Sequence, residues 1–521
     1  MIQQAISTPL LRGANLYTHL SCYIHLINSV LIAQLKIISY FCICTLDIFN
    51  GIGNDVRLGK RLNSLLDRMT STGSSIIHRC CHNVAERTGA YRLIKNERLI
   101  MEDIVSKIVE DSARRSTGLE HILCIQDTSE FSFDSHMGRL SSSDPDIGYG
   151  THHTQQYSIY AHPTLLIDAF SGMPLGFSSL QIFNHERSRQ RSKSRLKHEL
   201  PLEQKESFRW AASAIHTAET FPSEIRKTFI GDRENDIYEV MCLTLQAGCE
   251  FLIRSTHDRK VGDELQMLSD YMDSLPVMRQ YDLSLRGHRG RTARTAKMKV
   301  KYSKVSLHKS VRVPKHMPDR LECWCICAIE DESTVPPGEE PVEWRLLTSH
   351  KVENQEDAMQ CIEWYKCRWF IEELFRICKS KGFRMESAQL EDGASLKKLM
   401  VLTLFAALRC MALKRAYDEA DEKVPCNQVF DSDEIKVLHV EMKRIHDCSP
   451  RAMDGNNPFR ENSLPWAAWI IARMGGWSGY PKSHGQPGYI TMKTGWDLFQ
   501  RDVDFMTYYE RRRDEKDVYK D

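Results

Sequence analysis

The sequence lacks a net excess of charge of either sign. It contains 70 Lys and Arg residues against 69 Asp and Glu residues, which gives 521 residues a formal net charge of +1. Overall charge therefore does not indicate a nucleic-acid-binding protein, and any such function has to be argued from local clusters of basic residues. A phosphate-binding P-loop is also missing, so we expect no nucleotide cofactor and no nucleotide hydrolysis.

A regular cysteine framework is absent as well. The 17 cysteines follow no repeated spacing, and in a chain of this length they indicate a reducing compartment rather than a disulfide-stabilised fold. Hydrophobic residues make up 42% of the chain and charged residues 27%, which is typical of a soluble globular protein. The length is too great for a single hydrophobic core, so we expect two to four domains.

The chain lacks a clean membrane-spanning run, although residues 1–45 form an atypical N-terminal extension. Its stretch SCYIHLINSVLIAQLKIISYFCIC is apolar but is interrupted by His25, Asn28, Gln34 and Lys36. The stretch is a poor spanning helix in length and purity, and it lacks the small-residue cleavage site of a signal peptide. Three explanations of this stretch stay open. It is a packed helix, a weak membrane segment, or upstream sequence translated from a start codon placed too early. We favour the first or the third, and we expect no membrane partner.

Residues 46–118 have the periodicity of helices. In NDVRLGKRLNSLLDRM the apolar residues recur at steps of three and four, at Leu58, Leu62, Leu65, Leu66 and Met69. The basic residues of this stretch fall on other positions, at Arg57, Lys60, Arg61 and Arg68. A solvated helix face is the commoner explanation for such residues, and contact with nucleic-acid phosphates is the alternative.

After Gly118 the periodicity becomes that of strands. HILCIQDTSEFSF holds a short apolar run that ends on an acidic residue, and SIYAHPTLLIDAFSGMPLGFSSLQIF predicts two strands around a turn at Ser171–Gly172. KTFIGDRENDIYEV predicts a further strand, an acidic turn and a helix. This order indicates an α+β fold, with a mixed sheet that has helices on its faces.

One stretch carries a large local excess of basic residues. Between Arg279 and Arg320 there are thirteen Arg and Lys residues and two Asp residues. The solvated face of a β-hairpin is one explanation. We favour contact with phosphates, because each neutralised phosphate releases counterions. The residues that we expect to make this contact are Arg289, Arg291, Arg294 and Lys297.

Three acidic residues occupy positions where a charge is costly. Asp127 and Asp232 each end an apolar strand, and Glu372 lies on an apolar helix. A single acid at a strand end is commonly a turn or helix cap. Three together favour a site for Mg²⁺, which prefers carboxylate ligands and leaves positions for substrate phosphates. Two such ions can promote cleavage of a phosphodiester bond.

The helix that carries Glu372 has further polar residues in register. In YKCRWFIEELFRICK, Tyr365, Arg368, Glu372 and Lys379 are separated by three, four and seven residues, which predicts that they share one helix face. On this interpretation Glu372 would hold metal, Arg368 and Lys379 would hold phosphate, and the Tyr365 hydroxyl would donate to a phosphate. The alternative is a surface helix with ordinary ion pairs, such as Arg368 with Glu372.

The same stretch resembles a known signature. Y-x-x-R-x-x-x-E-x(6)-K is similar to the YREK motif of the insertion-sequence-four group of DDE transposases. DVRLGKRL and ERTGAYRLIKN resemble the DNA-binding helices of that group, and IQDTSEFSF and IGDRENDIYEV resemble its two motifs with catalytic Asp residues. PVEWRLLTS and SLPWAAWIIARMGGW are also similar. The resemblance covers residues 46–506.

The resemblance implies a fold and a set of domains. It implies a helical DNA-binding domain over 46–118 and a ribonuclease-H-like catalytic domain over 119–416, interrupted by a β-rich insertion at about 255–344. A polar connection over 417–461 and a helical dimerisation region over 462–521 would follow. In the last region Trp466, Trp469 and Trp477 lie at helical steps. They either pack on the catalytic core or meet a second copy, and the resemblance favours the second copy.

The resemblance also implies roles for individual residues. Asp127, Asp232 and Glu372 would be the catalytic, metal-binding triad, with Mg²⁺ as cofactor and Mn²⁺ as a substitute. Tyr365, Arg368 and Lys379 would contact the backbone of the transposon end. Trp344 would stack on a base flipped out of the DNA end, and its alternative is a buried strand aromatic.

The function implied is that of a cut-and-paste DNA transposase in a prokaryotic, nucleoid-associated cytoplasmic setting. Water would nick each end of the element, the freed 3′-OH would form a hairpin on the opposite strand, and the reopened 3′ ends would be joined to target DNA. Its partners would be double-stranded DNA and a second copy in a paired-end complex. A catalytically inactive DNA-binding relative and a nuclease without strand transfer are the alternatives.

Overall fold

The structure is a computed structural model. It describes residues 48–133, 138–150, 156–185, 202–285, 287, 292–379, 382–419, 421–448 and 456–517. The N-terminal extension, residues 1–45, therefore lies outside the described residues, as do Arg289 and Arg291. Within the described part, no helix combines the length and the apolar character needed to cross a membrane.

The first described region is helical, as the sequence predicts. Asp55 begins α2 by accepting a hydrogen bond from the backbone N–H of Arg57, and Gly73 ends it with a left-handed backbone that suits glycine. The apolar stripe of α2 is buried, whereas Arg57, Lys60 and Arg61 are exposed. The helices of this region are α2 (Val56–Thr72), α3 (Ile77–Cys80), α4 (Val84–Ile94) and α5 (Met101–Ser116).

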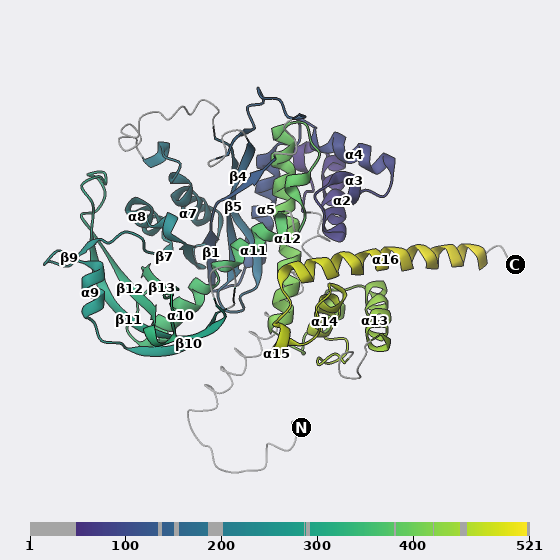
Figure 1. The fold of residues 1–521 in the computed structure, drawn as a ribbon. Coiled ribbons are helices and arrows are strands. Elements are labelled where there is room, and N and C mark those ends of the chain that lie inside the picture. The colour runs from purple at the N-terminus through teal and green to yellow at the C-terminus, as the bar shows by residue number, and fades with distance from the viewer. Residues whose placement is uncertain are drawn as a thin grey trace, which may run out of the picture.

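A mixed sheet forms the centre of the molecule (Figure 1). Its middle strands are parallel neighbours, and antiparallel strands lie on either side. The turn at Ser171–Gly172 joins two long antiparallel strands, as predicted, with Gly172 at a φ of 66°. These strands are β1 (His121–Gln126), β6 (Arg226–Gly231), β7 (Glu250–Arg254), β4 (Tyr157–Asp168) and β5 (Pro174–Phe183).

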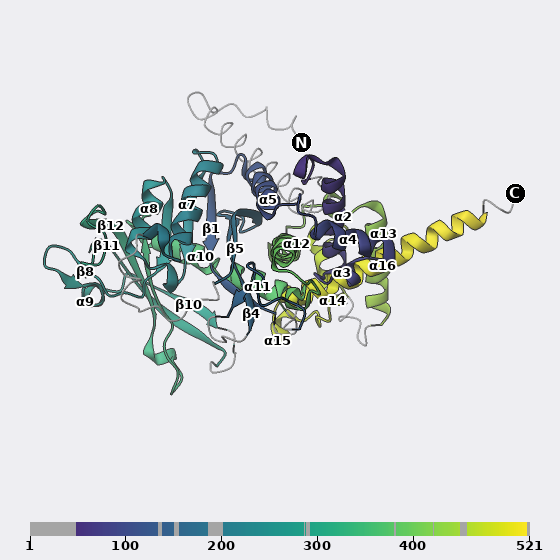
Figure 2. The same cartoon turned by 90° about the horizontal axis from the view of Figure 1, so that it is seen from above.

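Helices cover the sheet and connect it to the two terminal regions. The 27-residue helix α12 (Gly393–Glu419) is buried over most of its length and contacts β5, α5 and α2 on different sides. Figure 2 shows α12 nearly end-on between the sheet and the C-terminal helices. Helix α7 (Phe208–Thr220) packs on β5 and on α8 (Tyr238–Gln246). The predicted α+β fold, a mixed sheet flanked by helices, is confirmed.

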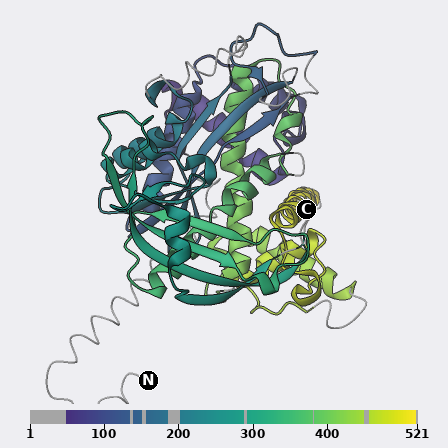
Figure 3. The same cartoon turned by 60° about the vertical axis from the view of Figure 1, so that its left-hand side comes forward.

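The segment between β7 and α10 (Gln355–Lys366) is rich in strands, as predicted, and it extends the central sheet rather than forming a separate layer. Its last strand pairs antiparallel with β7, so one sheet runs from β2 (Ser129–Ser132) to the far end of the segment (Figure 3). The strands are β8 (Lys260–Val261), β9 (Gln266–Met267), β10 (Arg279–Leu285), β11 (Arg294–His308), β12 (Arg320–Glu330) and β13 (Glu343–Thr348).

The C-terminal region is helical, but two details differ from the prediction. Residues 417–461 are not only a polar connection, because an Asp431–Glu434 capping box begins α13 (Ser432–Asp447) and its apolar face is buried. Trp466, Trp469 and Trp477 are at most 8% exposed. These tryptophans pack inside the chain, so their assignment to a dimer surface is wrong. The other helices are α14 (Leu464–Met474), α15 (Pro481–His484) and α16 (Tyr489–Asp517).

Candidate active site

Asp127 and Asp232 follow β1 and β6 directly, and these strands are parallel neighbours. Ile125 pairs with Ile230, so continuing the register by two residues brings Asp127 opposite Asp232. Neighbouring strands lie about 5 Å apart, which places the two acids side by side at one edge of the sheet. The Asp232 carboxylate also accepts a hydrogen bond from the backbone N–H of Glu234, as a turn cap does.

Glu372 comes to the same edge from α11 (Trp369–Cys378). Asp127, Glu372 and Lys379 line one open hollow of about 470 Å³. Between the two acids lies the Arg368 guanidinium, whose Nη2 donates to Glu372 Oε1 at 2.5 Å and whose Nη1 is 3.9 Å from Asp127 Oδ2. The three predicted acids therefore converge from two strands and one helix.

The Tyr365–Lys379 stretch is not one continuous helix, which corrects the predicted arrangement. Helix α10 ends at Lys366, and α11 begins at Trp369. At the junction Cys367 and Arg368 donate to carbonyls three residues back instead of four, which tightens the winding. Lys379 lies just after α11 with an extended backbone. The side chains still meet, because Arg368 reaches Glu372 and Lys379 lines the same hollow.

The electrostatics of the site favour a bound cation. Burial and, to a smaller extent, the charge of Asp232 together raise the pKa of the Asp127 carboxyl to about 7. A hydrogen bond from the Thr128 backbone and the Arg368 charge oppose this rise. Carboxylates are the ligands that Mg²⁺ prefers, and a divalent ion would offset the repulsion between them. Asp127, Asp232 and Glu372 therefore fit such an ion by their chemistry and by their placement.

A chain of polar side chains meets at Thr128, the residue next to Asp127, and no sequence pattern predicts it. The Thr128 hydroxyl lies 2.9 Å from Nδ1 of His162, which is fully buried on β4. Arg209 Nε donates to the same hydroxyl at 3.2 Å, and its Nη1 donates to Glu206. A lone histidine in an apolar strand cannot be distinguished from an ordinary core residue until its neighbours are known.

Tyr365 and Trp344 pack against one another beside the acids. Their ring centroids are 5.9 Å apart in an edge-to-face arrangement. Tyr365 is buried, which raises the pKa of its phenol, and Trp344 is half-buried on β13. Trp344 thus has both a packing partner in Tyr365 and an accessible part. Lys379, the other basic residue of the site, packs against a different ring: its ammonium lies 5.1 Å from the centre of the Phe131 ring.

The basic segment is neutralised more fully than its composition suggests. Arg294 is only 9% exposed in its side chain, and Glu330 and Glu339 both accept its hydrogen bonds. Its assignment to DNA phosphates is therefore contradicted, because two carboxylates already neutralise the guanidinium. Lys297 is exposed. The other ion pairs of the segment are Arg279–Glu356, Lys299–Asp331, Lys304–Glu322, Lys309–Asp319 and Arg320–Asp263.

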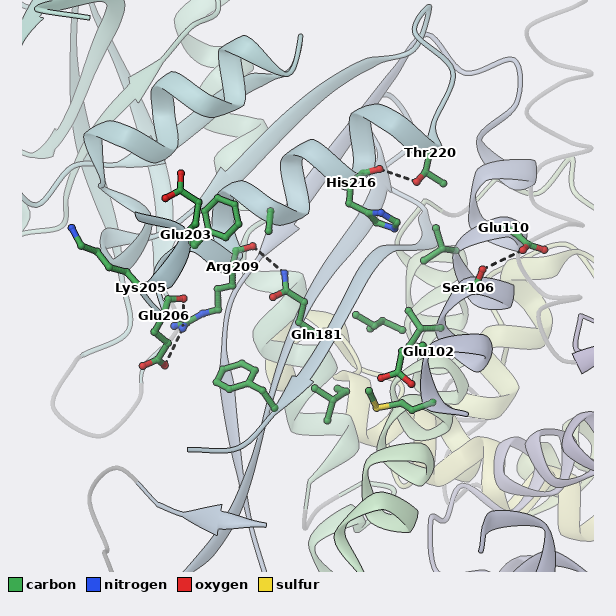
Figure 4. Close-up of a pocket in the computed structure, with 18 residues that line it drawn as sticks. Glu102, Ser106, Glu110, Gln181, Glu203, Lys205, Glu206, Arg209, His216 and Thr220 are labelled. Atoms are coloured by element: carbon green, nitrogen blue, oxygen red, sulfur yellow. Dashed lines mark hydrogen bonds and ion pairs between the residues drawn. The ribbon is translucent and has the colours of Figure 1, made fainter. Parts of the chain in front are cut away.

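A second and larger hollow, of about 690 Å³, is lined by residues of α5, β5 and α7. Figure 4 shows Glu102 and Glu110 of α5 on one side, His216 of α7 above, and Gln181 of β5 beside Arg209. Its apolar floor comes from β5 and its rim is rich in carboxylates. Its lining also holds Lys205 and Arg209, so charge alone does not separate the two hollows. The acids at the ends of β1 and β6 are the better candidate for a nucleic-acid site, because they follow neighbouring parallel strands and have Arg368 and Lys379 beside them to hold a phosphate.

Two family models match parts of this chain. Residues 214–409 match the transposase DDE domain, and residues 54–99 match the transposase DNA-binding domain. The first match contains Asp232 and Glu372, and Asp127 precedes it. The second contains α2 with its exposed basic residues. Two regions of the chain are therefore similar to the transposase DDE domain and to the transposase DNA-binding domain.

We predict that Asp127→Asn stabilises the metal-free protein at alkaline pH. The Asp127 pKa of about 7 lies above the value of about 3.9 in an unfolded chain. The contribution of this carboxyl to folding stability is therefore complete below pH 4 and is lost as the pH rises through 7. The asparagine variant should unfold at a higher temperature than wild type at pH 8 in chelator, by the equivalent of ~1–4 kcal/mol, but not at pH 4.

The measurement is thermal unfolding of both proteins at pH 4 and pH 8. The exposed Asp282→Asn on β10 is the matched control, and it should follow wild type at both values. Mg²⁺ should stabilise wild type more as the pH rises, because the ion binds the ionised carboxylate. Equal unfolding temperatures of wild type and Asp127→Asn at pH 8 would contradict a strained, buried carboxylate at this position.

Proposed function

We propose that this protein is a cut-and-paste DNA transposase whose catalytic residues are Asp127, Asp232 and Glu372. The observation that carries the proposal is the convergence of these acids around Arg368, inside or beside a stretch that matches the transposase DDE domain. The matching DNA-binding domain supplies a substrate class for the site. Phosphodiester bonds in DNA are the substrate that a cluster of carboxylates, an Arg and a Lys can hold through metal and phosphate contacts.

The three acids would hold Mg²⁺, for which Mn²⁺ can substitute. When bound, the ions supply charge stabilisation for the attacking and leaving oxygens of a phosphoryl transfer. Arg368 balances Asp127 and Glu372 in the metal-free protein. With metal and DNA present its guanidinium is free to grip a phosphate, and Lys379 adds a second positive charge at the same hollow.

The chemistry would be a series of phosphoryl transfers at this one place. Water first attacks a phosphate at the transposon end, and the leaving 3′ oxygen takes up a proton to become a 3′-OH. That hydroxyl attacks the opposite strand to form a hairpin, a second water reopens the hairpin, and the 3′-OH finally attacks target DNA. Each step forms one P–O bond and breaks one, so one arrangement of acids and phosphate-binding residues serves all of them.

DNA would be held by exposed basic residues away from the acids. On α2, Arg57, Lys60 and Arg61 face solvent within the region that matches the DNA-binding domain. In the β-rich segment Lys297 is the exposed candidate. Such contacts bind the backbone without reading sequence, and they weaken as salt rises. Tyr365 would position the end through its hydroxyl beside Arg368.

Cleavage should fail when any one of the three acids is removed. We predict that Asp127→Ala, Asp232→Ala and Glu372→Ala each abolish nicking of end-labelled DNA in Mg²⁺, while binding of the transposon end stays within a few-fold of wild type. Glu363→Ala is the matched control, because Glu363 is an exposed acid on the neighbouring α10. A variant that nicks at the rate of wild type would show that its acid is not a metal ligand.

Trp344 would stack on a base flipped from the DNA end. We predict that Trp344→Ala leaves the first nick unchanged and slows hairpin formation by about 5- to 150-fold, the equivalent of ~1–3 kcal/mol of lost stacking. Denaturing gels separate nicked, hairpin and blunt products. Trp344→Phe should recover part of the rate, because it keeps an aromatic face. Normal hairpin formation in Trp344→Ala would make this residue a packing partner of Tyr365 only.

A second copy of the chain would pair on the C-terminal helices. Helix α16 runs out from the body of the protein (Figure 1) and exposes Phe505 and Tyr509, whose rings stack on one another. Next to them a hollow of about 540 Å³ between α13 and α16 is lined by Val440 and Leu498. Exposed apolar residues beside a hollow are typical of an interaction surface. Two copies joined there would hold two transposon ends.

We predict that replacing Phe505 and Tyr509 together by Glu prevents formation of the paired-end complex but leaves binding of a single end. Native gels with one or two labelled ends distinguish the two species. Phe170→Glu is the control, because Phe170 is 98% exposed on the distant β4–β5 turn. If the double variant still forms paired complexes, the dimer surface lies elsewhere.

A further inference from the structure

The opposite edge of the central sheet carries a second cluster of groups that can bind metal. His121 is the first residue of β1, Glu250 is the first residue of β7, and His350 follows β13. One ligand atom from each lies within 4.8 Å of the others. Because β1 is six residues long, the cluster is about 20 Å from Asp127. It is therefore separate from the candidate active site.

The spacing of the cluster suits a small transition-metal ion. Glu250 Oε1 lies 3.5 Å from Nδ1 of His350. A tetrahedral zinc ion with bonds of about 2.0–2.1 Å holds its ligand atoms about 3.4 Å apart. The Glu250 and His350 atoms are already at that spacing. The His121 ligand nitrogen lies within 4.8 Å of both, and a rotation of its side chain can close the remaining distance.

The hydrogen bonds of His350 show which of its nitrogens carries a lone pair. Arg226 Nη2 is 3.1 Å from His350 Nδ1, and it also donates to both carboxylate oxygens of Glu250, at 3.0 and 3.1 Å. A guanidinium can only donate, so Nδ1 accepts and its lone pair faces Arg226, the group whose place an ion would take. The Thr228 hydroxyl lies 2.7 Å from Nε2 of both His350 and His121. It can accept from both rings and fix their orientation, as outer-shell partners of metal ligands do.

The imidazoles are also in the ionisation state that a metal requires. Burial lowers the pKa of His121 and of His350 to about 4, so both rings are neutral at physiological pH. Trp364 of α10 lies against both rings, with centroid distances of 4.8 and 4.9 Å, and shields them from water. Neutral imidazoles beside a carboxylate are ligands for Zn²⁺ rather than for Mg²⁺, which prefers oxygen.

We propose that His121, Glu250 and His350 form a binding site for a divalent transition-metal ion of the Zn²⁺ class, in which the Arg226 guanidinium stands in for the ion in the metal-free protein. The Arg226 side chain is 55% exposed, so it can move into solvent when an ion binds. Glu250 then exchanges one positive partner for another, which limits the cost of displacement. The proposal does not depend on the function assigned to Asp127, Asp232 and Glu372.

An ion at this place would tie together three distant parts of the chain. It would link the start of β1, the start of β7 and the segment that leads from β13 into α10. Because α10 continues through the tightened junction to Arg368, its position sets where the phosphate-binding residues of the candidate active site lie. The ion is thus a structural one, which holds α10 against the strand edge.

The test is metal binding to the purified full-length protein, measured as Zn²⁺ competition against a chromophoric chelator and as the visible spectrum of bound Co²⁺. His350→Gln and Glu250→Gln should each weaken the site at least tenfold. Arg226→Gln should tighten it at least tenfold, because the competing cation is gone. Arg226→Gln should also unfold at a lower temperature than wild type in chelator, and Zn²⁺ should restore that temperature.

Controls separate this site from the other metal-binding groups of the chain. Asp127→Ala should keep the site, and so should His216→Gln, which removes an exposed histidine of α7. A near-ultraviolet thiolate-to-cobalt band would place the ion on cysteines and overturn the proposal. Equal Zn²⁺ affinity in wild type, Arg226→Gln and Glu250→Gln would also overturn it, and would make Arg226 a permanent structural partner of the cluster. Because Arg226→Gln is expected to gain affinity, misfolding of His350→Gln does not remove the test.

Discussion

Repulsion between carboxylates at one edge of the sheet is the constraint on which the rest of the site depends. Parallel pairing of β1 with β6 brings Asp127 and Asp232 together, and burial makes their shared charge costly. Arg368 offsets this charge, and it does so because the α10–α11 junction turns it toward Asp127 while Glu372 stays one helical turn away. Helix α11 therefore has to lie where Arg368 and Glu372 reach the acids at the strand ends. The buried α12, which packs on α11, holds it in that place.

Charge in this protein is balanced between segments that are far apart in sequence. The basic run of β10 and β11 meets acids from β12, from the loop after it and from α10. Arg294 shows this most clearly, because its guanidinium forms ion pairs with two carboxylates, Glu330 and Glu339. A local count of Arg and Lys therefore overstates the positive potential available to a phosphate backbone. Among the described residues that we assign to DNA contact, Lys297 on β11 and Arg57, Lys60 and Arg61 on α2 are exposed and can supply it.

Sequence patterns located the candidate acids, because an acid that ends an apolar strand stays at the strand end in any sheet. They also gave the helical first region and the β-rich segment, whose periodicities are local. They did not give the break at Cys367–Arg368, because spacing alone cannot tell hydrogen bonds to the third residue back from those to the fourth. The burial of Trp466 and the cluster at His121, Glu250 and His350 were beyond reach, because both depend on residues brought together only by the fold.

The position of α12 in the chain has a consequence for biosynthesis. This helix packs on β5 and on α2, which precede it in the sequence by roughly 210–340 residues, a delay of about 10–70 s at typical rates of translation. During that interval the apolar surfaces that α12 will cover are formed by a nascent chain without their partner. Those surfaces stay uncovered until residues 393–419 have been made, and uncovered apolar surface is what makes a folding intermediate prone to aggregate.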